Sequence, residues 1–232
     1  MINVLLCGVG GQGTVLAAKV LAQAAQSKGW HVRTAETIGM AQRGGNVTSH
    51  VRMGSNGEAV YSSLITPGTA DMVIALEPGE AARALPYLAP GAVLVTATTA
   101  IQPVTAALAS QSYRAGDVVA ALANSLQAEA ACEQADADNG DGGCCQRQGT
   151  QAPGVDGYPV PLFLSVDDAA LVRELGPGSR KSLNMMLLAV AVAQGRVPLT
   201  VDELKQAVEA CVKPQFVAMN LQAIDHAAEA YG

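Results

Sequence analysis

A glycine-rich segment near the start of the sequence is the first candidate for a ligand-binding loop. Residues 8–13 read Gly-Val-Gly-Gly-Gln-Gly, which matches G-x-G-x-x-G, after an apolar run and before a segment of helical period. The glycines permit a tight turn and a close backbone approach, and the following helix offers free N–H groups that suit a phosphate. The candidate residues for a ligand, a phosphate or an interface are Gly8, Gly10, Gly11, Gln12, Gly13 and Thr14.

Two interpretations of this loop remain open on the motif alone. A dinucleotide site also needs an acidic residue at the end of the second strand, and Glu36 stands there, 23 residues after Gly13. That spacing favours NAD. In the other interpretation the glycines serve only the geometry of the backbone, and the pair Gly11-Gln12 is less typical of a dinucleotide loop.

A second glycine-containing segment, Ile38 to Asn46, has neither a helix nor a strand period and is interpreted as a functional loop. Its Arg43 can hold a phosphate or a carboxylate by two hydrogen bonds, or form an ion pair with a partner subunit. His50 and Arg52 share one face of the strand that follows and are expected to meet a partner or solvent. The candidate docking residues are Glu36, Gly39, Met40, Gln42, Arg43, Gly44, Gly45, Asn46, His50 and Arg52.

Each of three further residues could have either a structural or a functional role. Glu77 ends a predicted strand, and open α/β sheets bind ligands at such strand ends. The favoured role of Glu77 is nevertheless structural, as a carboxylate that stabilises the start of the next helix. Cys7 is expected to be a small buried residue rather than a nucleophile. Asn184, among apolar residues, is expected to cap a backbone group or to bond across an interface.

The elements that position these residues alternate along the chain. Apolar or alternating runs predict strands at residues 2–6, 31–35, 47–53, 71–76, 92–96 and 160–166, and Asn56-Gly57 predicts a hairpin in which residues 59–62 pair back. Helical periods cover residues 14–27, 77–88, 117–130, 167–174, 180–193, 201–210 and 216–230. This order predicts an α/β, Rossmann-like and mostly parallel sheet with helices on both faces and a C-terminal helical tail.

The chain is expected to form a single domain over residues 1–232, with one interruption. Residues 132–157 are rich in Asp and Gly and poor in large apolar side chains, which predicts a disordered insertion. Cys132, Cys144 and Cys145 lie in it, and incidental thiols are favoured over a metal or redox role. Residues 213–232 are expected to form a C-terminal helix or arm.

Composition narrows the range of partners and locations. The chain is 50% hydrophobic and 15% charged, which favours a surface partly covered by a partner subunit. A net charge of −6 and an aromatic content of 3% argue against nucleic-acid binding. No apolar run approaches the ~20 residues of a membrane span. Without a signal peptide, and with 5 cysteines, the protein is expected to be cytoplasmic.

Four ordered motifs together resemble one protein family. Residues 10–13, 39–52, 76–83 and 182–188 resemble the γ subunit of 2-oxoacid:ferredoxin oxidoreductases, and the indolepyruvate ferredoxin oxidoreductase β subunit is the nearest match. The resemblance extends from the start of the chain to about Ala223, apart from the insertion. Four motifs in order are more specific than a lone glycine loop.

The resemblance implies the small subunit of a heteromeric enzyme that decarboxylates a 2-oxoacid, with indolepyruvate or another aryl pyruvate as the candidate substrate. Thiamine diphosphate and the iron–sulfur clusters are then expected on the larger partner, which passes electrons to ferredoxin, while coenzyme A accepts the acyl group. This chain is expected to bind no cofactor alone, to carry no catalytic residue or metal, and to place residues 36–52 at the partner or coenzyme A side.

The sequence agrees with that division, since it lacks a ferredoxin-type cysteine run and a P-loop lysine. The alternatives are a free-standing NAD(P)-dependent dehydrogenase and a non-catalytic nucleotide- or coenzyme A-binding protein.

Overall fold

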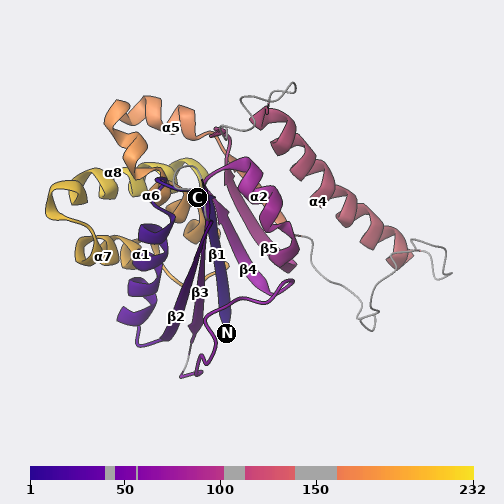
Figure 1. Cartoon of the computed structure of the whole chain (residues 1–232), viewed down its shortest axis with the longest axis horizontal. Coiled ribbons are helices and arrows are strands. Elements are labelled where there is room, and N and C mark those ends of the chain that lie inside the picture. The colour runs from indigo at the N-terminus through magenta and orange to yellow at the C-terminus, as the bar shows by residue number, and fades with distance from the viewer. Residues whose placement is uncertain (40–44, 56, 102–112, 139–160) are drawn as a thin grey trace.

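The computed structural model describes residues 1–39, 45–55, 57–101, 113–138 and 161–232. In this part of the chain one six-stranded sheet has the order β2-β3-β1-β4-β5-β6. Its strands are β1 (Ile2–Val9), β2 (His31–Ile38), β3 (Asn46–Gly54), β4 (Ala70–Ala75), β5 (Leu88–Ala97) and β6 (Leu162–Val166). Helices cover both faces (Figure 1), as the sequence predicts for an α/β protein.

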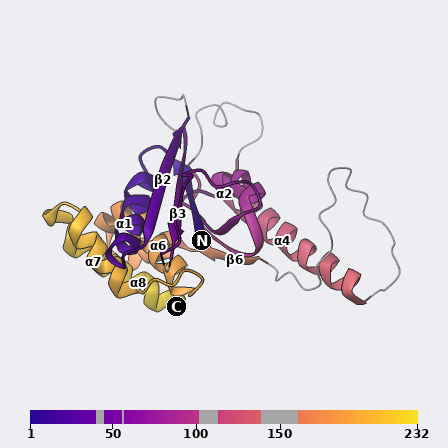
Figure 2. The ribbon, with the colours of Figure 1, turned by 90° about the horizontal axis from the view of Figure 1, so that it is seen from below.

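The helices fall into two groups, one on each face of the sheet (Figures 1 and 2). One face carries α1 (Thr14–Ser27), α6 (Leu183–Ala193), α7 (Val201–Cys211) and α8 (Pro214–Tyr231). The other face carries α2 (Pro78–Ala84) and the first half of α4 (Ala115–Asp138). The remaining elements are α5 (Asp168–Leu175) and two 3-10 helices, η1 (Leu85–Tyr87) and η2 (Pro177–Ser182).

The sheet is mostly parallel, but its first unit is interrupted by an antiparallel strand. β1, β4, β5 and β6 pair in parallel, whereas β3 lies between β1 and β2 and pairs antiparallel with both. β2 therefore runs in the direction of β1 without touching it. The connection from Ile38 to Asn46 is too short for a crossover helix, so β3 returns beside β2.

The central strands are buried because their sequences are continuously apolar. Every residue of β1 after Ile2 is buried, as are all residues of β4 except Asp71. Such runs suit strands that are covered on both faces. β2, at the edge, is largely exposed. The glycine-rich turn after β1 thus starts from one of the most enclosed strands in the sheet.

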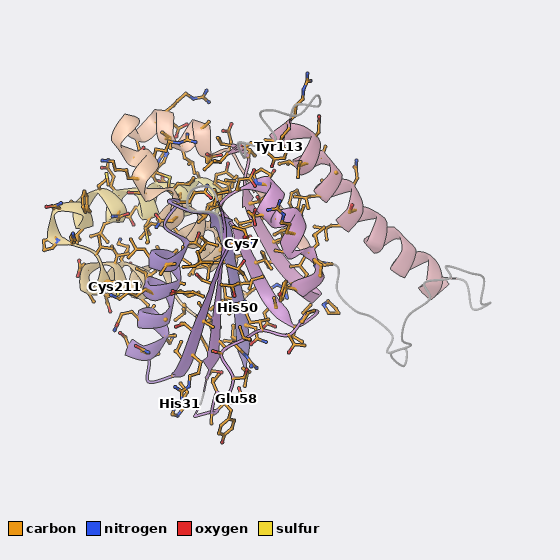
Figure 3. The ribbon with its side chains drawn as sticks, in the orientation of Figure 1. Cys7, His31, His50, Glu58, Tyr113 and Cys211 are labelled. Carbon is orange, nitrogen blue, oxygen red and sulfur yellow. The ribbon has the colours of Figure 1, made fainter. Side chains whose placement is uncertain are left out.

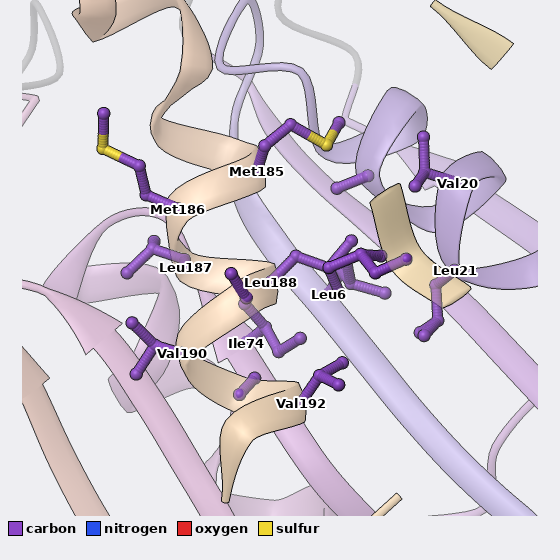
Figure 4. Close-up of a cluster of buried hydrophobic side chains, with 14 of the residues drawn as sticks. Leu6, Val20, Leu21, Ile74, Met185, Met186, Leu187, Leu188, Val190 and Val192 are labelled. Atoms are coloured by element: carbon purple, nitrogen blue, oxygen red, sulfur yellow. The ribbon is translucent and has the colours of Figure 1, made fainter. Parts of the chain in front are cut away.

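Helix α6 forms the centre of the larger hydrophobic core. Its residues from Leu183 to Val192 are all buried, so the helix is enclosed on every side, and Asn184 is the one polar residue among them. Figure 4 shows its side chains among Leu6 and Ile74 of the sheet and Val20 and Leu21 of α1. Because α8 packs on the outside of α6, the C-terminal segment that was expected to be a helix or arm covers the core.

Three sequence predictions about element boundaries are corrected. Residues 59–62 form no strand, because both edges of β3 are already paired, one with β1 and one with β2. Arg33 and Arg52 instead donate hydrogen bonds to the carbonyl oxygens of Val60 and Ser62 at 3.4 and 3.2 Å. α2 ends at Ala84 and is followed by η1, since Pro86 cannot continue an α-helical hydrogen-bond ladder. α4 continues to Asp138, beyond the end predicted at residue 130; residues 139–157 of the expected insertion lie outside the described part.

No helix among the described residues is long and apolar enough to cross a membrane.

Replacing Leu188 by alanine tests the role of α6 as the core helix. Leu188 is 0% exposed, so Leu188→Ala removes buried methyl groups and leaves a cavity. The free energy of unfolding should fall by about 2–5 kcal/mol, measured by urea denaturation followed by circular dichroism. Leu64→Ala is the control, because Leu64 is 55% exposed and its change should stay within about 0.5 kcal/mol. Equal losses would contradict the assignment.

Candidate functional site

The two glycine-rich loops that the sequence singled out meet at one end of the sheet. The N–H of Gly10 donates to the carbonyl oxygen of Gly45 at 2.9 Å, and Val9 pairs with Asn46 across β1 and β3. Gly39 closes the base of the second loop by donating to the carbonyl oxygen of Asn46 at 2.8 Å. Four of the predicted docking residues, Met40, Gln42, Arg43 and Gly44, lie outside the described part.

The turn of residues 8–14, here called the glycine corner, is held in shape by the side chain of Gln12. Its Oε1 accepts a hydrogen bond from the N–H of Val9 at 2.6 Å, and its Nε2 donates to the carbonyl oxygen of Leu76 at 2.7 Å. A single carboxamide therefore joins the end of β1 to the residue that follows β4. The sequence placed Gln12 in the loop but gave no sign of this second bond, because Leu76 lies 64 residues away.

Gly8 must be glycine because the interior of the corner is full. A Cβ atom at this position would lie 2.8 Å from Oε1 of Gln12 and 3.0 Å from both Cβ of Leu76 and Oγ1 of Thr14. All three distances are shorter than an ordinary van der Waals contact. Gly8 therefore allows the strand, the carboxamide and the first helical turn to pack together, which is the packing role that glycines have in such loops.

Asn184 fixes the other side of the corner from the core helix α6. Its Nδ2 donates to the carbonyl oxygen of Gly13 at 3.1 Å, and its Oδ1 accepts from the N–H of Met185 at 3.0 Å. Gly13 has a left-handed φ of 82°, and a Cβ there would lie 2.6 Å from Nδ2 of Asn184. The expectation that Asn184 caps a backbone group is confirmed, and its partner is Gly13, the residue that directly precedes α1.

The N-terminus of α1 is the feature of the corner that can act on a ligand. No side chain caps this helix, and its first turn contains no acidic residue. Free backbone N–H groups and the partial positive charge of the helix dipole therefore remain at its start. Gly10 and Gly11 beside it are exposed, and no atom lies within 4 Å of a Cβ built on Gly11. This arrangement suits an anionic group such as a phosphate.

Glu36 does not lie where a dinucleotide site would need it. It pairs with Ser49 of β3, which in turn pairs with Leu6 of β1. Two strand spacings, roughly 10 Å, therefore separate Glu36 from the strand that carries the glycine corner. The motif and its spacing suggested NAD, but the inserted strand removes the neighbour relation on which that suggestion depends.

Glu77 is a helix cap that also holds a tyrosine from a distant segment. Its Oε2 accepts from the N–H of Glu80 at 3.0 Å, which is the helix-start role that the sequence favoured. Its Oε1 accepts from the hydroxyl of Tyr113 at 2.5 Å. Burial, together with the Glu77 carboxylate, raises the pKa of Tyr113. The sequence analysis missed Tyr113, because no motif links it to a residue 36 positions earlier.

His50 and Arg52 lie away from the corner, further toward the other end of the sheet. Arg52 donates to the side chain of Asn3 at 3.0 Å and to the carbonyl oxygens of Ser62 and Leu64 at 3.2 and 3.3 Å. Its guanidinium therefore supports a loop of its own chain. Figure 3 shows His50 on the sheet below Cys7, with Tyr113 at the corner end and Glu58 at the opposite end.

The described residues provide no activated nucleophile at the corner. Cys7 is buried under α2, and burial, followed by the charges of Glu80 and Glu77, raises the pKa of its thiol. A protonated, enclosed thiol is a poor nucleophile and a poor metal ligand. Within the described ranges no group of three or more His, Cys, Asp and Glu residues could hold a metal ion. In this part of the chain the exposed glycines and the uncapped start of α1 are the features suited to an anionic group.

Comparisons with known proteins agree over nearly the whole chain. The sequence model of the family described as pyruvate ferredoxin/flavodoxin oxidoreductase matches residues 3–230. The indolepyruvate oxidoreductase subunit IorB of Pyrococcus horikoshii is 28% identical over 223 residues, which cover 96% of this chain and 92% of that protein.

Two solved structures share the fold. The γ subunit of a keto/oxoacid ferredoxin oxidoreductase from Geobacter sulfurreducens has a TM-score of 0.59 and 18% identity, over 99% of this chain and 97% of that one. The 2-oxoglutarate:ferredoxin oxidoreductase of Magnetococcus marinus, solved with 2-oxoglutarate, coenzyme A and succinyl-CoA, has a TM-score of 0.61 and 17% identity, and the whole of this chain matches 31% of that chain.

The packing around Gly8 gives a direct test of the corner. Gly8→Ala should lower the free energy of unfolding by about 1–3 kcal/mol, because the added methyl group collides with Gln12, Thr14 and Leu76. Gly116→Ala is the matched control, since Gly116 lies in a helix with open space around it and should gain roughly 0.5–1 kcal/mol. Chemical denaturation measures both. A Gly8→Ala protein as stable as the parent would refute the tight corner.

Proposed function

The chain belongs to the pyruvate ferredoxin/flavodoxin oxidoreductase family, and we propose that it is the small, γ-type subunit of a heteromeric ferredoxin-dependent 2-oxoacid oxidoreductase. The holoenzyme decarboxylates a 2-oxoacid, passes the electrons through iron–sulfur clusters to ferredoxin and transfers the acyl group to coenzyme A. Thiamine diphosphate supplies the decarboxylation chemistry on the larger subunit. The likeness to an IorB subunit over 96% of the chain supports indolepyruvate or another aryl pyruvate as the substrate.

The single observation that carries this proposal is that the glycine corner has a fixed backbone, exposed glycines at Gly10 and Gly11 and no titratable side chain. Gln12 and Asn184 fix its backbone, and α1 offers unpaired N–H donors. Such a surface can bind and orient a charged group that a partner subunit or a cosubstrate presents.

We further propose that the corner and the base of the Gly39–Asn46 loop form the surface that meets the larger subunit on its coenzyme A side. Coenzyme A carries phosphate groups, and the start of α1 is suited to hold one of them. The bond from Gly10 to Gly45 supports this arrangement, because it makes the two loops one continuous surface. The proposal includes the predicted docking residue Arg43, because Arg43 lies between Gly39 and Asn46 in the sequence.

The described cysteines fit a subunit that leaves electron transfer to its partner. Cys7 and Cys211 are free and stand on β1 and α7 respectively, so they cannot share a cluster that needs several thiolate ligands. Free thiols also fit a reducing compartment, which supports a location in the cytoplasm. A dinucleotide-dependent dehydrogenase is not favoured, because β3 separates Glu36 from the glycine corner.

Assembly with a larger subunit is the direct test of the proposed function. Co-expression with a subunit that carries thiamine diphosphate and ferredoxin-type cysteine motifs should give a stable heteromer. That heteromer should reduce ferredoxin when a 2-oxoacid and coenzyme A are both supplied, and neither subunit should do so alone. Oxidation of a 2-oxoacid, or reduction of a nicotinamide, by this chain in isolation would contradict the proposal.

A charge placed at the start of α1 tests the coenzyme A side separately. Val15 is 38% exposed in the first turn, so Val15→Asp adds a negative charge where a phosphate would bind, in a position that the helix dipole stabilises. The KM for coenzyme A in the heteromer should rise about fivefold, the size of one close charge repulsion in water. Val15→Asn is the neutral control. If both variants change the KM equally, coenzyme A does not approach this helix.

A further inference from the structure

The face of the sheet opposite the core helix α6 is hollowed. A cleft of about 220 Å³ is bounded by β1, β3 and the end of β2 on one side and by α2 and Tyr87 on the other. It exists because α2 is short and packs over β1, β4 and β5, leaving this face of β3 and β2 without a covering helix in the described part. Drug-sized ligands occupy pockets of about 300–1,000 Å³, so this cleft suits a smaller molecule.

The cleft has an apolar part and a polar part, and the polar part includes, from the strand ends, Thr37, Asn46 and Thr48. Leu5 and Cys7 of β1 form part of the apolar wall, and Ala84 and the ring of Tyr87 close it from the other side. Leu5 is buried and has no ionisable group. Burial raises the pKa of the Cys7 thiol, so Cys7 keeps its proton and adds no charge to the wall. A short hydrocarbon body placed here would be removed from water, which is favourable at about 25 cal/mol per Å² of apolar surface.

His50 offers one defined hydrogen-bond donor to the cleft. Its Nδ1 accepts from the N–H of Ile65 at 3.2 Å, so in the neutral ring the hydrogen is carried by Nε2. Nε2 has no hydrogen-bond partner among the residues that the structure describes. Burial lowers the pKa of His50, which keeps the ring neutral, and the edge of the Tyr87 ring holds it at a centroid distance of 5.9 Å. The imidazole is thus a fixed, neutral donor.

Arg83 offers further donors, and Glu80 orients it. Glu80 is buried, and its Oε1 forms an ion pair with one terminal nitrogen of Arg83, three residues later on α2. The other guanidinium nitrogens make no hydrogen bond within the described ranges, and the Arg83 side chain is 68% exposed. The carboxylate of Glu80 is therefore already paired, whereas donors at Arg83 and His50 have no partner in the part of the chain that the structure describes. A carboxylate matches this set, since a planar guanidinium binds it through two bonds.

We propose that this cleft binds a small amphipathic monocarboxylate, with its carboxylate on Arg83 and Nε2–H of His50 and its hydrocarbon body against Ala84 and the ring of Tyr87. The site uses residues that the proposed function leaves without a role, and it does not depend on that function. Glu80 gives the rival possibility, because a buried carboxylate also attracts amines. We favour a carboxylate ligand over an amine, because the Glu80 carboxylate is already paired with the Arg83 guanidinium.

The three histidines of the chain make the proposal testable by proton NMR of their imidazole rings. The full-length protein is titrated at pH 7.5 and constant ionic strength with butyrate, butyramide and butylamine, and His50→Asn assigns the His50 signal. Butyrate should shift the His50 signal to saturation, while the signals of His31 and His226 stay in place. No saturable shift, an equal shift with butyramide, or a shift with butylamine alone would overturn the proposal.

A pair of arginine variants identifies the site. Arg83→Gln should weaken butyrate binding at least tenfold, read from the same His50 signal. Arg173→Gln is the matched control, because Arg173 also lies exposed in the last turn of a short helix, α5, and should leave the affinity unchanged. Unchanged His31 and His226 signals show that each variant is folded. Equal affinity in the Arg83→Gln protein and the parent would assign the shift to another site and refute this one.

Discussion

The Gln12 carboxamide is the interaction on which the functional end of this protein depends. It joins the N–H of Val9 to the carbonyl oxygen of Leu76, so the ends of two adjacent parallel strands are tied by one side chain. Buried backbone groups need partners, and these two would otherwise have to find water inside a crowded turn. Because the carboxamide meets both needs, α1 can start close behind β1 with its own N–H groups pointing outward.

The hydrophobic core supports the same corner from behind. α6 is buried on every side, and the one polar residue that it directs to the corner, Asn184, holds the carbonyl oxygen of Gly13. A well-packed apolar helix is a rigid base, since close-packed interiors resist deformation. The start of α1 is therefore fixed from two directions, by Gln12 from the sheet and by Asn184 from the core. A rigid corner can orient a charged group without adapting its own shape, which fits an accessory role beside a partner's cofactor.

The inserted strand β3 explains why a familiar loop motif has a different use here. In a dinucleotide fold the acidic residue of the second strand lies beside the glycine loop. Here β3 separates them, and in exchange its first residues bring the Gly39–Asn46 loop against Gly10. The same insertion leaves a sheet face on the α2 side that no described helix covers, and there His50 faces the cleft with Arg83. This strand order therefore separates Glu36 from the glycine corner and leaves two other surfaces beside β3.

The sequence alone determined the elements, the class of fold and the family. α1 begins and ends at the predicted residues 14 and 27, because a glycine loop and Gly29 mark both ends, and continuous apolar runs located β1 and β4. Four ordered motifs were enough to indicate a γ-type subunit. Local patterns carry such information because helix and strand periods depend on neighbouring residues.

Only the tertiary structure decided which distant residues meet. The bond from Gln12 to Leu76, that from Tyr113 to Glu77 and the use of Arg52 to hold the carbonyl oxygens of Ser62 and Leu64 join residues whose spacing follows no period. The position of β3 between β1 and β2 belongs to the same class, since strand order depends on which pairing buries the most surface and satisfies the most backbone groups. No local sequence pattern records that choice, and it separates Glu36 from the glycine corner.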